Sequence, residues 1–352
     1  MDDMEIIKKV LVTGSEGYIG SVLMPMLIKE DFKVTGLDRC FYSEGNLTNE
    51  ILPEYRIVRK DIRDISPDDL EGFDSVVHLA ALSNDPLGKL NEELTFQINY
   101  KASVKLARIA KSAGVKRFIF SSSCSLYGAN NKILSENDKA NPQTAYGKSK
   151  ILAEEEIAEL ADINFSPVYL RNATAFGISP RMRFDIVVNN LIGYAKTEKV
   201  IRIFGDGSPW RPLVHVKDIC KAIIFSLKAP KDVVHDQSFN IGSSNQNFQI
   251  KSIAEKIKTF YKECKIEIMK KDAGDTRNYI VSFDKAEKLL RFTPDYSLNR
   301  GIEEMKNSFE KINLTKELFD NRLYTRLKQI EYLINEGELN ADLRQAEEKI
   351  IV

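Results

Sequence analysis

Residues 10–20 of the chain read VLVTGSEGYIG, and this stretch determines the fold. The apolar run 8–13 has the length of a buried strand, and a helix-length segment, 20–29, follows the glycines. In such a loop the first glycine permits a tight turn, the second lets the backbone approach a pyrophosphate, and the third lets the helix pack on the strand. N–H groups at the start of the helix favour phosphate. The stretch therefore predicts a dinucleotide-binding loop formed by Gly14, Gly17, Tyr18, Ile19 and Gly20.

The segments around this unit alternate between strand-length apolar runs and helix-length amphipathic runs. Strands are predicted at 33–37, 55–59, 75–79, 117–121 and 166–170, and helices at 91–113 and 149–160. This alternation predicts βαβ units and a mainly parallel sheet, and right-handed crossovers place helices on both faces. The predicted fold class is α/β, a Rossmann-like doubly wound parallel sheet with a smaller, interleaved α/β substrate-binding domain.

The regular alternation of strand-length and helix-length segments ends after Arg171, and this change predicts the domain organisation. Residues 1–175 are expected to form the dinucleotide-binding domain, with 213–242 returning to its sheet. Residues 176–212 and 243–312 are expected to form the substrate-binding domain. Residues 313–352 are charged and helix-prone, and they predict a C-terminal extension that is either a packed helical appendage or partly disordered.

Composition excludes several classes of protein. The 352 residues include 51 basic and 51 acidic side chains, so a nucleic-acid partner is not expected. No apolar run approaches 18 residues, and the acidic start leads straight into a strand, so neither a membrane span nor a signal peptide is expected. The four cysteines lie far apart and the three histidines form no metal-binding motif. We therefore expect a cytoplasmic enzyme without a metal site.

Residues suited to the adenosine half of a dinucleotide follow the next strands. Asp38 comes eighteen residues after Gly20, where a carboxylate binds ribose hydroxyls. A carboxylate there repels a 2′-phosphate and favours NAD, whereas the adjacent Arg39 could accept that phosphate and leaves NADP open. The residues expected to contact adenine and the cofactor after the third and fourth strands are Asp61, Ile62, Leu79, Ala80 and Ala81.

A tyrosine and a lysine four residues apart, Tyr146 and Lys150, predict a general base. They share one face of a helix, and a nearby ammonium favours the phenolate form of a phenol, which is otherwise a poor base at neutral pH. The serine run 121–125 follows the fifth strand at the same sheet edge as the glycine loop. A serine there can hydrogen-bond a reacting oxygen; the alternative is a polar strand exit that bonds only to nearby backbone.

Taken together, TGSEGYIG, SSSCSLYG and YGKSK resemble the extended short-chain dehydrogenase/reductase family, in its nucleotide-sugar epimerase/dehydratase branch. The resemblance covers about residues 7–310 and includes RPLVHVKDI, FNIG and GDTRNY. It implies NAD as the cofactor, a nucleotide-diphosphate sugar as the substrate, and a homodimer formed through the helices 91–113 and 149–160.

The resemblance also implies residue roles. Tyr146 would be the base, Lys150 would assist it and hold the nicotinamide ribose, and Ser123 would bond the sugar oxygen. Asn99 would hold its helix and the backbone beside the cofactor, which Ser121 would also approach. Guanidinium groups suit a diphosphate, although each arginine could instead form a surface ion pair. The implied substrate-binding residues are Ser83, Ser123, Cys124, Ser125, Asn172, Arg181, Asn190, Leu191, Phe204, Arg211 and Arg277, with Asn84 and Asp85 beside Ser83.

Two departures narrow the expected reaction. Relatives that are 4,6-dehydratases carry an Asp-Glu pair where this chain has Cys124 and Ser125, so that elimination is not expected. The segment GISPRMRFD, 177–185, resembles the corresponding segment of nucleotide-sugar dehydrogenases and epimerases that act on unusual bacterial surface sugars. We therefore expect an NAD-dependent nucleotide-sugar 4-epimerase that acts through a transient 4-keto sugar in surface-polysaccharide or sugar-nucleotide biosynthesis. The alternatives are a 4-keto-sugar reductase or C4 dehydrogenase with an exchangeable cofactor, and a non-catalytic cofactor sensor.

Overall fold

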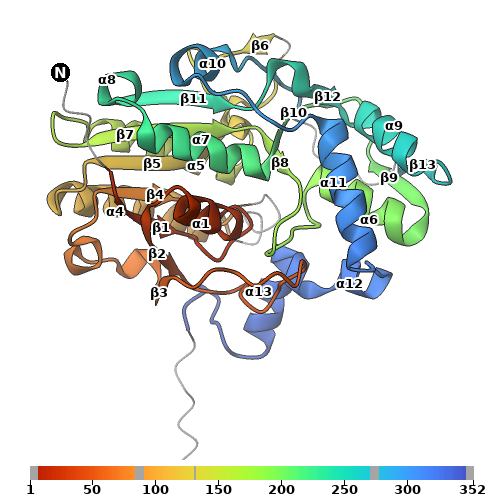
Figure 1. Cartoon of the computed structure of the whole chain (residues 1–352), viewed down its shortest axis with the longest axis horizontal. Helices are drawn as coiled ribbons and strands as arrows, with labels where there is room; N and C mark the ends of the chain where they lie inside the picture. Colours follow the sequence, from red (N-terminus) through yellow and green to blue (C-terminus); the bar gives the residue numbers. More distant parts are fainter. Residues whose placement is uncertain (1–6, 84–90, 131, 270–276, 346–352) are drawn as a thin grey trace, which may run out of the picture.

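A computed structural model describes residues 7–83, 91–130, 132–269 and 277–345. Its main feature is a seven-stranded sheet in the order β11-β7-β5-β4-β1-β2-β3, and every pair of neighbours in it is parallel (Figure 1). This order confirms the predicted α/β fold class with a doubly wound parallel sheet. The strands are β1 (Lys9–Thr13), β2 (Lys33–Asp38), β3 (Arg56–Arg59), β4 (Ser75–His78), β5 (Arg117–Ser123), β7 (Ser166–Asn172) and β11 (Gln237–Ile241).

Helices cover both faces of the sheet, and each face has its own apolar core. On one face, α1 (Gly20–Lys29) contacts α7 (Val216–Lys228), and they pack on strand residues such as Val10 and Val12. On the other face, α4 (Ala102–Ser112) contacts α5 (Ala145–Ala158), and both pack on residues such as Leu11. Successive side chains of a strand point to opposite faces, so each buried strand feeds both cores.

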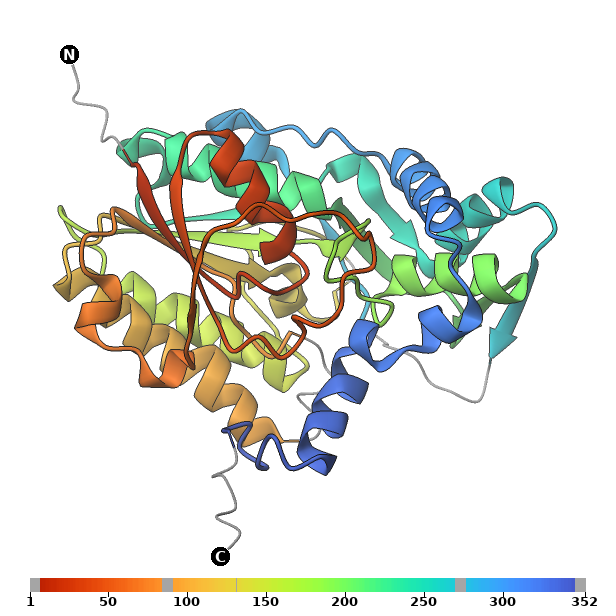
Figure 2. The ribbon, with the colours of Figure 1, turned by 60° about the horizontal axis from the view of Figure 1, so that its bottom comes forward.

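A smaller set of elements lies beside the carboxyl ends of these strands (Figures 1 and 2). It contains a three-stranded sheet, a parallel strand pair and the helices that cover them. Its core is continuous with the core on the α1 side of the large sheet. The elements are β8 (Thr174–Phe176), β10 (Trp210–His215), β12 (Asn247–Gln249), β9 (Val200–Phe204), β13 (Lys265–Met269), α6 (Val187–Glu198), α9 (Ile250–Phe260) and α11 (Leu298–Lys311). The remaining short elements are β6 (Ile133–Leu134), β14 (Ile280–Val281), α8 (Lys231–Val234) and α10 (Asp284–Leu290).

Two predicted helices have different bounds in the structure. The predicted helix 91–113 consists of α3 (Glu92–Phe96), a π-helical stretch η3 (Gln97–Lys101) and α4. Asn99 lies in the π-helical stretch, which fits the tendency of π-bulges to occur at functional sites. The predicted helix 149–160 begins earlier, at Ala145, because the Thr144 side chain accepts a hydrogen bond from the Gly147 N–H and caps the helix there.

The C-terminal extension is packed on the rest of the chain as far as residue 345. It contains α12 (Lys316–Asp320), a short 3₁₀ turn η6 (Arg322–Tyr324) and α13 (Arg326–Asn335), followed by an isolated β-bridge between Leu339 and Gln345. Figure 2 shows it, in blue, running back from α11 towards the large sheet. The packed appendage is therefore the alternative that the described residues support.

Candidate active site

The loops at the carboxyl ends of the parallel strands surround one cavity of about 970 Å³. This is the edge at which open parallel sheets bind ligands, and the volume lies in the upper range of small-molecule sites. The predicted residues that line it on the dinucleotide side are Gly14, Gly17, Tyr18, Ile19, Gly20, Asp38, Asp61, Ile62, Leu79, Ala80, Ala81 and Ser121. Those that line it elsewhere are Ser83, Ser123, Ser125, Tyr146, Asn172, Asn190, Leu191, Phe204, Arg211 and Arg277.

The glycine loop has the geometry that a pyrophosphate site needs. Gly14 has φ +76°, and a Cβ there would lie 2.7 Å from the Ala80 nitrogen. A Cβ on Gly20 would collide with the Gly14 carbonyl. Helix α1 can therefore pack this closely against the loop only because residue 20 has no side chain. A Cβ on Gly17 would meet only the Gly14 oxygen, at 3.2 Å, and otherwise faces open space. The loop therefore leaves room above Gly17 for a ligand at the start of α1.

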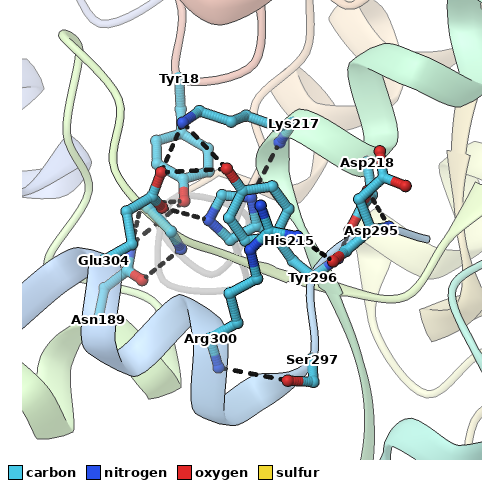
Figure 3. A network of polar contacts seen from close by, with 11 residues as sticks. Tyr18, Asn189, His215, Lys217, Asp218, Asp295, Tyr296, Ser297, Arg300 and Glu304 are labelled. Carbon is cyan, nitrogen blue, oxygen red and sulfur yellow. Dashed lines mark hydrogen bonds and ion pairs between the residues drawn. The ribbon is translucent and has the colours of Figure 1, made fainter.

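Tyr18 connects the glycine loop to the loop that follows β8. Its hydroxyl donates to the Gly177 carbonyl at 2.7 Å, and Asn189 donates to the Tyr18 oxygen at 3.3 Å (Figure 3). Burial raises the pKa of Tyr18 well above its ordinary value, so the phenol remains a hydrogen-bond donor. The two halves of the cavity are thus joined by a buried neutral contact.

A second, partly buried network surrounds His215, whose ring lies against Gly177 (Figure 3). His215 Nδ1 accepts from the Lys217 N–H at 3.3 Å, so its Nε2 is the nitrogen that donates to Glu304, at 2.8 Å. Lys217 Nζ donates to the same carboxylate at 2.5 Å, and the Tyr296 ring stacks on His215 with the centroids 3.9 Å apart. This network ties α11 to the junction of β10 and α7.

Two carboxylates are held at the dinucleotide side of the cavity. The oxygens of Asp38 accept hydrogen bonds from the Cys40 N–H at 2.6 Å and the Glu16 N–H at 3.0 Å. Burial raises the pKa of Asp38, although both N–H groups act to lower it. Burial would also raise the pKa of Asp61, but the hydrogen bonds and charge of Arg63 outweigh it and lower that pKa. Both side chains are therefore oriented before any ligand binds.

The predicted base lies on the first turn of α5. Tyr146 lines the cavity, whereas Lys150 is buried behind it, with Nζ 5.8 Å from the centre of the Tyr146 ring. Lys150 Nζ donates to the Ser121 carbonyl at 2.7 Å and lies 4.6 Å from the centre of the Phe120 ring. Burial lowers the pKa of Lys150 to about 7, although the charge of Glu154 raises it. The lysine can therefore hold or release a proton near neutral pH.

Polar side chains at the ends of β5 and β7, and in the turn that follows β5, line the cavity. The Ser123 Oγ accepts from the Ser125 N–H at 3.1 Å, so its hydrogen is available to the cavity. The hydroxyls of Ser122 and Ser125 and the Oδ1 of Asn172 are buried without a hydrogen-bond partner. A buried polar atom without a partner costs about 1–3 kcal/mol. Other atoms of these side chains contribute to the lining of the cavity.

Two arginines, Arg211 and Arg277, also line the cavity. Arg211 donates to the Arg277 carbonyl and to the Trp210 carbonyl, and its guanidinium carbon lies 5.5 Å from the centre of the Tyr279 ring. Asn190 and Leu191 of α6 line the same cavity. Paired guanidinium groups bind diphosphate through several charge-assisted hydrogen bonds.

Some predicted residues do not reach the cavity. The direct substrate contacts predicted for Cys124 and Arg181 need correction: Cys124 Sγ is buried and donates to the Arg171 carbonyl at 3.1 Å, and Arg181 pairs with Glu16 at 2.8 Å. Asn99 is buried and bonds both the N–H and the carbonyl of Leu82, so it positions the loop after β4 without facing the cavity. Asn84 and Asp85 lie outside the described residues.

Several lining residues were missed by the sequence analysis. Tyr42 follows β2, and Arg326 and Leu343 belong to the C-terminal extension, yet all three line the cavity. Apolar residues at 327, 330, 333 and 334 could have indicated that the extension packs, but nothing in the sequence indicates where. In the described ranges, no cluster of metal-binding side chains occurs and no helix is long and apolar enough to cross a membrane.

The comparisons with known proteins agree with this geometry. The model of the NAD dependent epimerase/dehydratase family matches residues 10–242. A UDP-glucose 4-epimerase of Corynebacterium glutamicum is 28% identical over 316 residues, which cover 84% of this chain and 94% of the relative. An uncharacterized UDP-glucose epimerase of Bacillus subtilis, YtcB, is 29% identical over 311 residues, which cover 84% and 95%.

Two solved structures with bound UDP-glucose are similar to this chain over most of its length. The UDP-glucose 4-epimerase of Thermotoga maritima with UDP-glucose has a TM-score of 0.76 and 25% identity, and the match covers 86% of this chain and 99% of that one. MoeE5 in complex with UDP-glucose and NAD has a TM-score of 0.75 and 26% identity over the same shares. Each of these proteins is matched nearly end to end, while 14–16% of the present chain has no counterpart in it.

Proposed function

The chain belongs to the NAD dependent epimerase/dehydratase family, and we propose that within this family it is an NAD-dependent UDP-sugar 4-epimerase. The observation that carries the proposal is that one cavity is lined by the glycine loop and Asp38, by Tyr146 and Ser123, and by Arg211 and Arg277. The relatives named as UDP-glucose 4-epimerases support UDP-sugars as the substrate class.

The residues present fit NAD. The space above Gly17 suits its pyrophosphate, and the oriented Asp38 carboxylate suits its ribose hydroxyls and disfavours a 2′-phosphate. The structure of MoeE5 with UDP-glucose and NAD supports the same cofactor. Bound NAD would supply a hydride acceptor, and then a hydride donor, for C4 of the sugar.

Tyr146 is the proposed base. Its phenol oxygen takes the proton of the 4-hydroxyl as the hydride leaves C4, and it returns the proton when the 4-keto sugar is reduced again. A proton held by Lys150 behind the ring favours the phenolate. The hydroxyl of Ser123 donates to the 4-oxygen and keeps it directed at Tyr146.

Inversion at C4 requires the 4-keto sugar to present its opposite face before the hydride returns. Arg211 and Arg277 would hold the diphosphate during that movement, so that the sugar turns without leaving the cavity. Where 4,6-dehydratases carry an Asp-Glu pair, this chain has Cys124 and Ser125, and the Cys124 thiol points away from the cavity. Burial raises the pKa of Cys124 well above its ordinary value. This arrangement provides no acid–base pair for water loss and favours epimerisation over 4,6-dehydration.

The proposal extends to the location, the biosynthetic role and the oligomeric state of the protein. We propose that the protein works in the cytoplasm, supplies sugars for surface polysaccharide, and forms a homodimer through the faces of α4 and α5. The family resemblance supports the dimer, whereas the large apolar side chains that are exposed in the described ranges lie on neither helix. Light scattering coupled to size-exclusion chromatography tests the dimer, and a monomer at micromolar concentration would contradict it.

The proposed activity is tested by a tyrosine substitution. Tyr146→Phe is expected to lower kcat by about 10²–10⁴-fold, because it removes the general base, while NAD stays bound. Conversion of UDP-glucose, UDP-glucuronic acid and UDP-N-acetylglucosamine is followed by proton NMR, and bound NAD is released by denaturation and quantified. Tyr261→Phe is the matched control, since Tyr261 does not line the cavity and its buried hydroxyl has no hydrogen-bond partner. A Tyr146→Phe enzyme with normal kcat would refute the assignment.

A further inference from the structure

The C-terminal extension, residues 313–345, is here called the clasp because it reaches from α11 back across the dinucleotide side of the molecule (Figure 2). It contacts the segments that follow β2, β3 and β4. Asp38, Asp61 and Leu79–Ala81, the residues assigned to the adenosine half of the cofactor, lie at the ends of these three strands.

The first contact is with the loop after β2. Gln329 Nε2 donates to the Phe41 carbonyl at 3.0 Å, and the guanidinium carbon of Arg326 lies 4.0 Å from the centre of the Tyr42 ring. Both Phe41 and Tyr42 line the cavity. A cation over a tyrosine face contributes about 0.5–2 kcal/mol, more when the pair is desolvated. Helix α13 thus fixes the wall that lies directly beyond Asp38.

The second contact is with the segment after β3. Arg63 holds Asp61 through two side-chain hydrogen bonds and also donates to the Asp342 carbonyl at 2.8 Å. Arg344 forms an ion pair with Asp64 and lies 3.6 Å from Asp61. The end of the clasp is therefore attached to the side chain predicted to hold the adenine edge.

The third contact is apolar and reaches the loop after β4. Leu339 and Leu343 join Ile330 of α13 in a small core with Leu82 and Leu94. Leu343 is 3% exposed and still lines the cavity, as does Leu82. Ile62 lines the same cavity, and apolar side chains suit an adenine face, which has few polar partners.

The clasp also brings a positive charge to the cavity wall. The Arg326 side chain is 3% exposed and donates to the Arg181 carbonyl at 2.8 Å, while Arg183 pairs with Asp185. The Arg326 backbone N–H also donates to Asp185, at 3.3 Å. Burial and the charge of Arg183 lower the pKa of Arg326 to about 10, and the charge of Asp38 opposes this. A phosphate group in the cavity would add a further counter-charge for Arg326.

We propose that the clasp completes the cofactor site: Leu343 closes over the adenine end, and Arg326 offers its charge to the pyrophosphate of NAD. The clasp would then slow the release of NAD, which suits an enzyme that regenerates its cofactor in every turnover. This proposal rests on the proposed function, because it takes NAD as the cofactor. It goes beyond that function, because it assigns binding residues to a segment outside the matched family region, 10–242.

The test is the rate of NAD release from the full-length protein. The holoprotein is loaded with isotope-labelled NAD, excess unlabelled NAD is added, and retained label is followed with time. Leu343→Ser and Arg326→Gln are each expected to release NAD about tenfold faster or more, since losing one buried leucine contact or one charge pair corresponds to at least that factor. The matched controls are Leu289→Ser, a half-exposed leucine of α10, and Lys328→Gln, an exposed cation of α13. Both are expected to release NAD at the wild-type rate.

The outcomes separate the clasp from the epimerase. Release rates within twofold of wild type in both variants would overturn the clasp and leave the proposed function standing. Wild-type protein that holds NAD and releases it slowly, with variants that release it faster, would support the clasp even if no UDP-sugar is epimerised. Wild-type protein that cannot be loaded with NAD would overturn both. Should a variant not fold, hydrogen exchange of wild-type residues 326–345 decides: their amides must exchange more slowly with NAD than without it.

Discussion

Replacing Glu304 with glutamine is expected to destabilise the fold by about 3 kcal/mol at pH 7. The carboxylate receives hydrogen bonds from His215 and Lys217. Burial alone would raise the pKa of Glu304, but these two partners outweigh it and lower the pKa to about 2, from an ordinary value of 4.5. At 1.36 kcal/mol for each tenfold change, this difference corresponds to about 3 kcal/mol. Glutamine has the shape of the protonated acid, so the variant should lose this amount.

The sign of the pH dependence follows from the lowered pKa. The stabilisation is present above the ordinary pKa of 4.5, and it is lost as the pH falls towards 2 and the folded protein binds the proton as well. The difference between wild type and Glu304→Gln should therefore shrink from about 3 kcal/mol at pH 7 to about 1.5 kcal/mol at pH 3. At about 2 cal/mol/K of unfolding entropy per residue, the loss at pH 7 lowers Tm by about 4 °C.

Calorimetry and urea unfolding at several pH values measure this difference. Glu303→Gln is the matched control, because it removes an exposed carboxylate from the adjacent position of α11 and should change Tm by less than about 1 °C. Glu304 does not line the cavity, so kcat at 25 °C should stay within about threefold of wild type. A stability loss that is the same at pH 3 and pH 7, or one below about 0.5 kcal/mol at pH 7, would refute the reasoning.

Three further substitutions test the site and its support. Arg211→Gln should raise KM for a UDP-sugar about tenfold or more with a smaller change in kcat, because a diphosphate contact is lost; steady-state kinetics measure both, and an unchanged KM would contradict the assignment. Gly20→Ala should lower Tm and weaken NAD binding, since a Cβ would collide with the Gly14 carbonyl, and a fully stable, NAD-bound variant would argue against the close approach. Glu154→Gln should cost about 3–5 kcal/mol in urea unfolding because Arg171 would keep a buried charge without its carboxylate; a loss under 1 kcal/mol would be inconsistent with that burial.

Much of the candidate site could be predicted because its parts are short and local. The glycine loop places Gly14, Gly17 and Gly20 on one strand-to-helix turn, so their spacing alone defines the backbone geometry. Tyr146 and Lys150 are neighbours on one helix face, and only the capping of that helix by Thr144 shows that it begins early enough to include the tyrosine. The alternation of strands and helices likewise predicts the parallel sheet, because a parallel connection needs a crossover segment.

Side-chain direction was not predictable from spacing. Cys124 lies between serines that line the cavity, and its thiol nevertheless points to the Arg171 carbonyl, because the chain leaves β5 there in a 3₁₀ turn. Arg181 pairs with Glu16, which is 165 residues away in the sequence. A pairing of this kind depends on how the loop after β8 folds against the glycine loop, and no local pattern records it.

Local sequence patterns suffice to identify the strand–loop–helix unit, the succession of βαβ units and the proposed base, because each depends on residues within a few turns of one another. The set of arginines that line the cavity and the position of the C-terminal extension instead depend on packing between distant segments. Arg326 and Leu343 reach the cofactor side through contacts with Tyr42, Leu82 and Arg63, at separations of more than 250 residues. Those contacts are selected by burial of apolar surface and by pairing of buried charges, which depend on the packed structure as a whole.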